Sequence, residues 1–178
     1  MAMPDRFILA ADIPSGVTPR ECEKLSELAQ GKAVIELGSH FGRSTIALAS
    51  TAAIVHAVDW HMGDGHAGMN DSLEIFVKNL TRYKVREKIV VHVARFETLF
   101  PLLKEKLFDM AFIDAFHERE AVEKDTAAVL PLLKPGATIA FHDYGQPVFG
   151  VTPAVDGFVK TFGLKLEVVE HLAFTQLQ

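Results

Sequence analysis

Short apolar runs recur along the chain and alternate with segments of helical pattern. The runs are rich in β-branched and aromatic side chains and cover residues 33–37, 53–58, 89–93, 110–113 and 138–141. Continuous apolar runs of this length are typical of parallel strands that are buried on both faces of a sheet. Their alternation with helical segments predicts an α/β fold, in which helices cover both faces of a mostly parallel sheet.

Helical segments fill the stretches between these runs. Thr18, Pro19 and Glu21 match a capping box with proline at the first helical position, which predicts a helix that ends at Gly31. Pro131 marks a point where the helix expected over 118–133 kinks or ends early. Other helices are expected over 44–49, 71–83 and 153–162. Two final strands, over 164–169 and 172–177, are close enough in sequence to form an antiparallel hairpin.

Composition excludes several classes of protein. The 178 residues are 49% hydrophobic and 23% charged, which is enough apolar material for one well-packed domain. A net charge of −5 is a poor basis for clamping nucleic acid or an anionic membrane. Cys22 is the single cysteine, so an intrachain disulfide and a cysteine-based zinc cluster are excluded. With no signal-peptide pattern and no run long enough to span a bilayer, we expect a cytoplasmic protein.

The turn after the first predicted strand is glycine-rich. Gly38 and Gly42 allow the backbone to approach a ligand, and the following helix N-terminus offers free N–H groups. The pattern is acid-x-Gly-x-x-x-Gly rather than the G-x-G-x-x-G of dinucleotide-binding proteins. A carboxylate at Glu36 would repel a pyrophosphate but suits a cationic ligand. The alternative is a tight strand–helix turn that binds nothing.

Asp59 ends the second predicted strand. An acid at this position can accept hydrogen bonds from both hydroxyls of a ribose, as in nucleotide-binding folds. The alternative is a solvated loop aspartate. Together with the glycine turn, Asp59 favours a nucleoside-containing cofactor.

With these features, the chain resembles the class I S-adenosylmethionine-dependent methyltransferases, and among them the small-molecule O-methyltransferase-like branch. The resemblance covers nearly the whole chain and depends on four segments in order. These are ELGSHFGRST at 36–45, VDW with the glycine-rich stretch after it at 58–68, FDMAFID at 108–114, and LKPG leading into FHDY at 133–144. The resemblance implies a Rossmann-like, doubly wound sheet of seven strands whose last strand runs antiparallel.

The resemblance also implies S-adenosylmethionine as cofactor. Asp59 would hold the ribose, Trp60 would cover the ribose or adenine, and Glu36 would order the turn or contact the ammonium group. Phe96 follows the third strand, where many relatives carry a small polar residue or an acid, so the adenine contact there would be stacking or backbone hydrogen bonding. The full set of expected cofactor residues is Glu36, Gly38, Ser39, Gly42, Ser44, Asp59, Trp60, Phe96 and Asp114.

Polar side chains follow the fourth and fifth predicted strands, where the methyl group would point. These are Asp114, His117, His142 and Asp143. Relatives of the catechol O-methyltransferase type bind a divalent cation at these strand ends, which implies a magnesium or other divalent site formed by Asp114, His142 and Asp143. In a metal-free alternative, His142 or His117 is a general base beside Asp143. In a third alternative the aspartates merely cap loops. Phe149, Val151 and Pro153 follow the fifth strand and either line an apolar acceptor pocket or pack as an ordinary helix face, and the resemblance implies that residues 12–16 lie over the cofactor.

We therefore expect a methyltransferase that acts on an oxygen, less readily a nitrogen, of a small-molecule acceptor. A single domain would span 1–178, with a lead and helix over 1–30 and the cofactor-binding core over 31–178. No nucleic acid or membrane partner is expected, and self-association stays open. The loop over 60–69 is long enough for a lid, and the spacing of its histidines with Asp64 is a weak zinc pattern. The alternatives are a regulatory cofactor-binding protein and, ranked lower, an NAD-dependent oxidoreductase.

Overall fold

The computed structural model describes residues 10–63, 71–103 and 105–178, and its centre is a sheet in which the described strands follow the order β3-β2-β1-β4-β5-β7-β6. The strands are β1 Ala33–Leu37, β2 Ile54–Asp59, β3 Ile89–Val93, β4 Phe108–Ile113, β5 Leu133–Phe141, β6 Glu167–Val169 and β7 Leu172–Gln176. The first five strands run parallel to one another, while β7 runs antiparallel to both β5 and β6. The predicted seven-stranded, mostly parallel sheet is confirmed.

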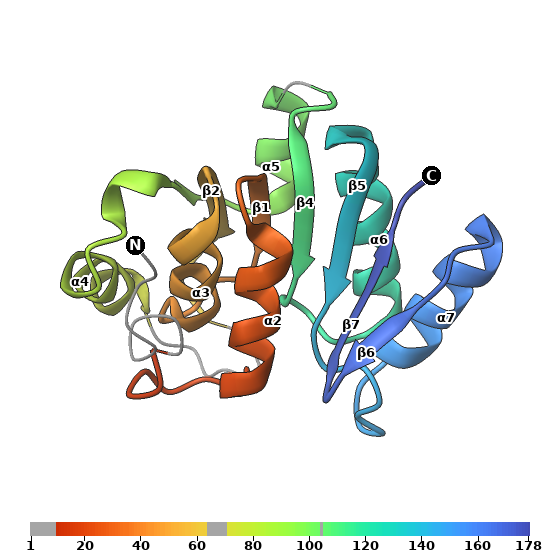
Figure 1. The fold of residues 1–178 in the computed structure, drawn as a ribbon, viewed down its shortest axis with the longest axis horizontal. Coiled ribbons are helices and arrows are strands. Elements are labelled where there is room, and N and C mark those ends of the chain that lie inside the picture. The colour runs from red at the N-terminus through yellow and green to blue at the C-terminus, as the bar shows by residue number, and fades with distance from the viewer. Residues whose placement is uncertain (1–9, 64–70, 104) are drawn as a thin grey trace.

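Helices cover both faces of this sheet (Figure 1). They are α2 Pro19–Ala29, α3 Arg43–Thr51, α4 Leu73–Arg82, α5 Phe96–Leu99, α6 Arg119–Val129 and α7 Val151–Phe162. Alternate residues of each strand point to opposite faces. Val34 therefore packs in a hydrophobic cluster with α2, α3 and α4, while Ile35 packs in a second cluster with α6 and α7. The continuous apolar runs in the sequence are explained by these two buried faces.

The strand order places a topological switch between β1 and β4. From β1 the chain moves outward through β2 to β3, and then it returns to β4 on the other side of β1. In open α/β sheets, ligands bind beyond the carboxyl ends of the strands at such a point. The arrowheads of β4 and β5 point to the lower edge in Figure 1, and this edge carries the residues that the sequence singles out.

The start of β5 departs from the predicted element boundaries, whereas the early end of α6 near Pro131 is confirmed. Strand β5 begins at Leu133, whereas the sequence predicted a helix up to residue 133 and a strand only from residue 138. A shift in the pairing register between β4 and β5 accommodates the interruption at Pro135 and Gly136, where Gly136 has φ 76°. Helix α6 ends at Val129 and passes into a 3₁₀ turn over Leu130–Leu132, because Pro131 lacks the N–H group that a continuing helix requires.

The helix α2 begins as predicted. The Thr18 hydroxyl accepts a hydrogen bond from the Glu21 backbone N–H, and the Glu21 carboxylate accepts one from the Thr18 N–H. No helix within the described ranges is long and apolar enough to cross a membrane.

Candidate functional site

A cavity of about 610 Å³ opens at the carboxyl ends of the parallel strands. Its volume lies in the range of small-molecule sites. The loops after β1 to β5 all contribute to its wall, together with residues 14–16 ahead of α2. Most of the residues expected to bind the cofactor line it, namely Gly38, Ser39, Gly42, Ser44, Asp59, Trp60, Phe96 and Asp114.

The glycine turn is built by close backbone contacts. Gly38 has φ 84°, and a Cβ atom at this position would lie 2.0 Å from the Asp114 carbonyl oxygen. Gly42 has φ 90° and precedes the first turn of α3. Only glycine combines these backbone angles with so little space. The turn therefore brings the ends of β1 and β4 together and exposes the N-terminus of α3 to the cavity.

Asp59 organises this turn from the neighbouring strand. Its Oδ2 accepts hydrogen bonds from the backbone N–H groups of Ser39, at 2.9 Å, and His40, at 2.8 Å. Its Oδ1 accepts one from the N–H of His61 at 2.7 Å. His40 and His61 have φ values of 42° and 59°, in the left-handed region that most side chains avoid. The carboxylate thus supports two strained loop residues as well as lining the cavity.

Glu36 lies behind the turn rather than in the cavity wall. It is fully buried and accepts a hydrogen bond from the Thr45 hydroxyl on α3 at 2.5 Å. Burial raises the pKa of Glu36 to about 8, against the opposing effect of the Ser44 and Thr45 hydroxyls. Glu36 therefore ties β1 to α3, and it is the one expected cofactor residue outside the cavity lining.

His142 lies at the centre of a buried charge cluster after β5. Its Nδ1 is 3.3 Å from Asp114 Oδ1 and from Asp143 Oδ2, and its Nε2 is 3.3 Å from Glu21 Oε2. Burial disfavours the charged imidazole, but the three carboxylates outweigh it and raise the pKa of His142 far above its usual value. A histidine held as an imidazolium is a poor general base, so His142 is suited to holding the two aspartates in place.

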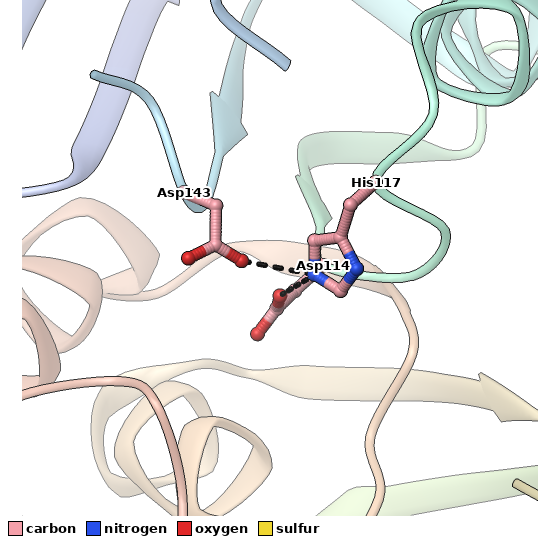
Figure 2. A group of neighbouring side chains, drawn as sticks. All are labelled: Asp114, His117 and Asp143. Carbon is pink, nitrogen blue, oxygen red and sulfur yellow. Dashed lines mark ion pairs between the residues drawn. The ribbon is translucent and has the colours of Figure 1, made fainter. Parts of the chain in front are cut away.

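His117 faces the same two aspartates from the loop before α6 (Figure 2). Its Nε2 is 2.9 Å from Asp143 Oδ2 and 3.9 Å from Asp114 Oδ1. Burial raises the pKa of Asp143, but hydrogen bonds from His117 and His142 hold it well below its usual range. Asp143 also has φ 60°, a conformation that is strained for a residue with a side chain.

Three of these residues have the geometry of a cation site. One ligand atom from each of Asp114, His117 and Asp143 lies within 4.8 Å of the others. Two carboxylates and one imidazole form a donor set that divalent ions accept. This set contains His117 where the sequence suggested His142, because both nitrogens of His142 face carboxylates.

The other end of the cavity is aromatic. The Arg95 guanidinium lies 4.1 Å from the centre of the Trp60 ring, and both residues line the cavity. Phe96 lines it as well, and its ring stacks on Phe100 at 5.8 Å between centroids. At the acceptor side, Phe149 lines the cavity and stacks on His117 at 4.4 Å, as the sequence suggested for an apolar pocket wall.

Two acids of the site are not apparent from the sequence. Glu21 matches a capping box, but the pattern does not show that its carboxylate also accepts a hydrogen bond from the His171 N–H and faces His142. Asp125 lies on α6 and lines the cavity while only 7% exposed. An acid at helical spacing between the buried Val122 and Val129 is the one signal that could have drawn attention to it.

Several expectations fall elsewhere. Residues 64–70, which hold most of the expected lid loop and the zinc pattern with Asp64, lie outside the described residues. Val151 is buried against the sheet, and neither it nor Pro153 lines the cavity. Residues 14–16, expected over the cofactor, do line it.

Solved structures share this fold. The O-methyltransferase from Bacillus cereus, solved in complex with SAH, is 20% identical, with a TM-score of 0.69 over 95% of this chain and 86% of that chain. The O-methyltransferase TomG from Streptomyces achromogenes, involved in tomaymycin synthesis and solved with SAM, is also 20% identical, with a TM-score of 0.69 over 98% and 87%. A tRNA methyltransferase from Aquifex aeolicus is 16% identical, with a TM-score of 0.71 over 98% and 76%. No curated protein gives a significant match.

A family model described as a methyltransferase domain matches residues 35–144, which is more than half of the chain. The matched range begins in β1 and ends just beyond the cluster residues that follow β5, so it contains the glycine turn, Asp59 and both site aspartates. The chain therefore belongs to the methyltransferase domain family, and it is a methyltransferase of the class I type.

Proposed function

We propose that the protein transfers a methyl group from S-adenosylmethionine to an oxygen atom of a small-molecule acceptor. The observation that carries this proposal is that one cavity joins the glycine turn and Asp59 to the cluster of Asp114, His117 and Asp143. A nucleoside cofactor held at the first set and an acceptor held at the second would meet within that cavity. The volume of about 610 Å³ is large enough for both roles to be served together.

The residues of the turn suit the methionine part of the cofactor. The N-terminus of α3 offers backbone N–H groups to a carboxylate. Ser39 is 4% exposed and lines the cavity, and its hydroxyl has no hydrogen-bond partner among the described residues, so it is available to a ligand. Asp59 uses three of the roughly four lone-pair sites of a carboxylate, and its remaining capacity suits a ribose hydroxyl.

The charge cluster suits activation of an acceptor hydroxyl. S-Adenosylmethionine supplies a methyl group that is already activated on a sulfonium. As the oxygen–carbon bond forms and the carbon–sulfur bond breaks, the hydroxyl loses its proton and S-adenosylhomocysteine is the second product. Asp114 and His117 line the cavity where that proton would be accepted, while Asp143 and His142 orient them.

A divalent cation fits this cluster. Asp114, His117 and Asp143 would hold it, and it would lower the pKa of an acceptor hydroxyl. In the metal-free alternative, His117 is itself the base. Activity in excess chelator separates the two: a loss that Mg²⁺ or Mn²⁺ restores supports the metal, and full activity eliminates it.

Cofactor binding is the first test of the proposed function. We expect titration calorimetry to detect binding of S-adenosylhomocysteine, and a screen of phenols and other small hydroxyl compounds to detect its release from S-adenosylmethionine. The His117→Ala variant should bind the cofactor but lose transfer. An absence of cofactor binding to the wild-type protein would refute the proposal, whereas binding without turnover of any acceptor would favour the regulatory alternative.

A further inference from the structure

Asp125 is a buried acid for which the proposed methyl transfer has no use. It lies on α6, is 7% exposed, and lines the cavity. Its Oδ2 is shielded from solvent and has no hydrogen-bond partner among the described residues. A buried carboxyl oxygen without a partner is costly, so its retention at a cavity wall indicates a partner that arrives with a ligand.

The position of Asp125 identifies the part of the ligand that it would meet. Lys124, the preceding residue, forms an ion pair with Glu97 at 2.7 Å, which links α6 to the segment after β3. Phe96 and Ala121 line the cavity beside these residues. Asp125 therefore belongs to the aromatic end of the cavity next to the β3 loop, which Arg95, Glu97 and Lys124 also line, away from the charge cluster after β5.

The order of the loops assigns this end to the base of the cofactor. Under the proposed function, the methionine part lies at the turn after β1 and the ribose at Asp59 after β2. The base continues in the same direction, toward the loop after β3 and the aromatic surface of Phe96. An apolar surface can stack a purine, but it does not distinguish one purine from another. Recognition of the base requires a polar group, and Asp125 is a buried one at that end.

We propose that Asp125 recognises the 6-amino group of the cofactor's adenine by accepting a hydrogen bond from it. This inference rests on the proposed function and adds the residue that selects the base. It also explains how the chain can recognise adenine with Phe96 at the position after β3 where many relatives carry a polar residue or an acid. Here the acid that contacts the base comes from α6. Burial first, and then Glu97, raises the pKa of Asp125 to about 7, while Lys124 opposes the shift. Above this pH the carboxylate only accepts hydrogen bonds, which matches an amino group and opposes a carbonyl oxygen.

The test compares two ligands that differ at the 6-position of the purine and in the proton on the adjacent N1. S-Inosylhomocysteine carries a carbonyl oxygen where S-adenosylhomocysteine carries the amino group. We expect the wild-type protein at pH 8.5 to bind the adenosyl compound at least about tenfold more tightly, the scale of a lost hydrogen bond to a charged group. Asp125→Asn, whose amide can accept from an amino group or donate to a carbonyl, should reduce this ratio to within about threefold.

A second variant and a matched control complete the test. Asp125→Ala should also reduce the ratio, and because both ligands are measured on the same variant, a general loss of stability does not change it. Glu123→Gln removes an exposed acid from the same helix, where it pairs with Arg119, and should keep the wild-type ratio. The inference is overturned if the wild-type protein does not discriminate, or if both Asp125 variants still do. If the wild-type protein binds neither ligand, the proposed function fails, and this inference with it.

Discussion

At the scale of single residues, Asp59 has structural roles that its short sequence motif does not predict. Its place at the end of a predicted strand indicates a ribose ligand. The structure adds that its two oxygens accept from three backbone N–H groups in two loops. These hydrogen bonds cannot be inferred from the spacing of the residues, because they depend on the left-handed backbone of His40 and His61. No sequence pattern predicts a left-handed backbone at a residue other than glycine.

The Asp59→Asn variant should therefore lose both stability and cofactor affinity. Asparagine keeps one acceptor oxygen, so its amide group must face at least one N–H that the carboxylate had satisfied. We expect a loss of about 1–3 kcal/mol in the free energy of unfolding by urea, and an affinity for S-adenosylhomocysteine at least about tenfold weaker. Asp156→Asn, which changes an exposed acid bonded to Tyr144, is the control. A loss of stability with unchanged affinity would leave Asp59 a purely structural role.

Glu36 predicts a pH dependence whose sign follows from its burial. Its pKa is about 8 in the folded protein against an ordinary value of 4.5. The folded state thus holds this proton more tightly than the unfolded state, and stability decreases as pH rises from about 4.5 to 8. Glu36→Gln removes this loss. Between pH 5 and 8, the wild type should therefore lose up to about 4 kcal/mol of unfolding free energy relative to the variant. Glu23→Gln, on the exposed face of α2, should show no such trend, and a constant difference for Glu36→Gln would contradict the assignment.

At the scale of elements, the strands were the most predictable part of the fold. Burial on both faces makes the central strands β1 and β4 largely apolar runs, and the local composition reflects that burial directly. The start of β5 was missed because Lys134, Pro135 and Gly136 are exposed or half-exposed and resemble a helix stop. Their pairing with β4 depends on a register shift, which is a property of two strands and not of one segment.

The β1–α3 turn gives a prediction at this scale. Gly38→Ala places a Cβ atom 2.0 Å from the Asp114 carbonyl oxygen, so the ends of β1 and β4 must separate. Gly31→Ala meets a similar backbone cost at φ 70° but nothing within 4 Å, and is the matched control. We expect Gly31→Ala to cost about 1–2 kcal/mol and to leave cofactor binding intact. Gly38→Ala should cost clearly more in thermal unfolding and abolish measurable binding of S-adenosylhomocysteine. Equal effects of the two changes would show that the close approach to Asp114 is unimportant.

At the scale of the whole molecule, the sequence predicted which strand-end residues gather at the cavity, but not which of them share a cation site. Asp114, His142 and Asp143 were expected together because parallel strands end at one edge. Both histidines lie beside the aspartates, but His117 is the third candidate cation ligand, since Glu21 comes from the other end of the chain and faces the Nε2 atom of His142. Contacts between segments so far apart in the sequence cannot be predicted from the local spacing of residues. The position of Asp125 in the cavity lining could not be predicted for the same reason.

A ligand that fills the cavity contacts segments from most of the chain, so it should stabilise the whole molecule as a unit. The two hydrophobic clusters lie on opposite faces of one sheet, and the cavity draws on segments from residue 14 to residue 149. We therefore propose that 1–178 unfolds as a single domain, with one cooperative transition by calorimetry. Saturation with S-adenosylhomocysteine at about 100 times its Kd should add about 2.7 kcal/mol and raise the Tm of that transition by roughly 5–10 °C. Asp59→Asn should need more ligand for the same shift, whereas Asp156→Asn should follow the wild type. Two separate transitions, or a shift confined to one of them, would show that the cofactor-binding core folds independently of the rest of the chain.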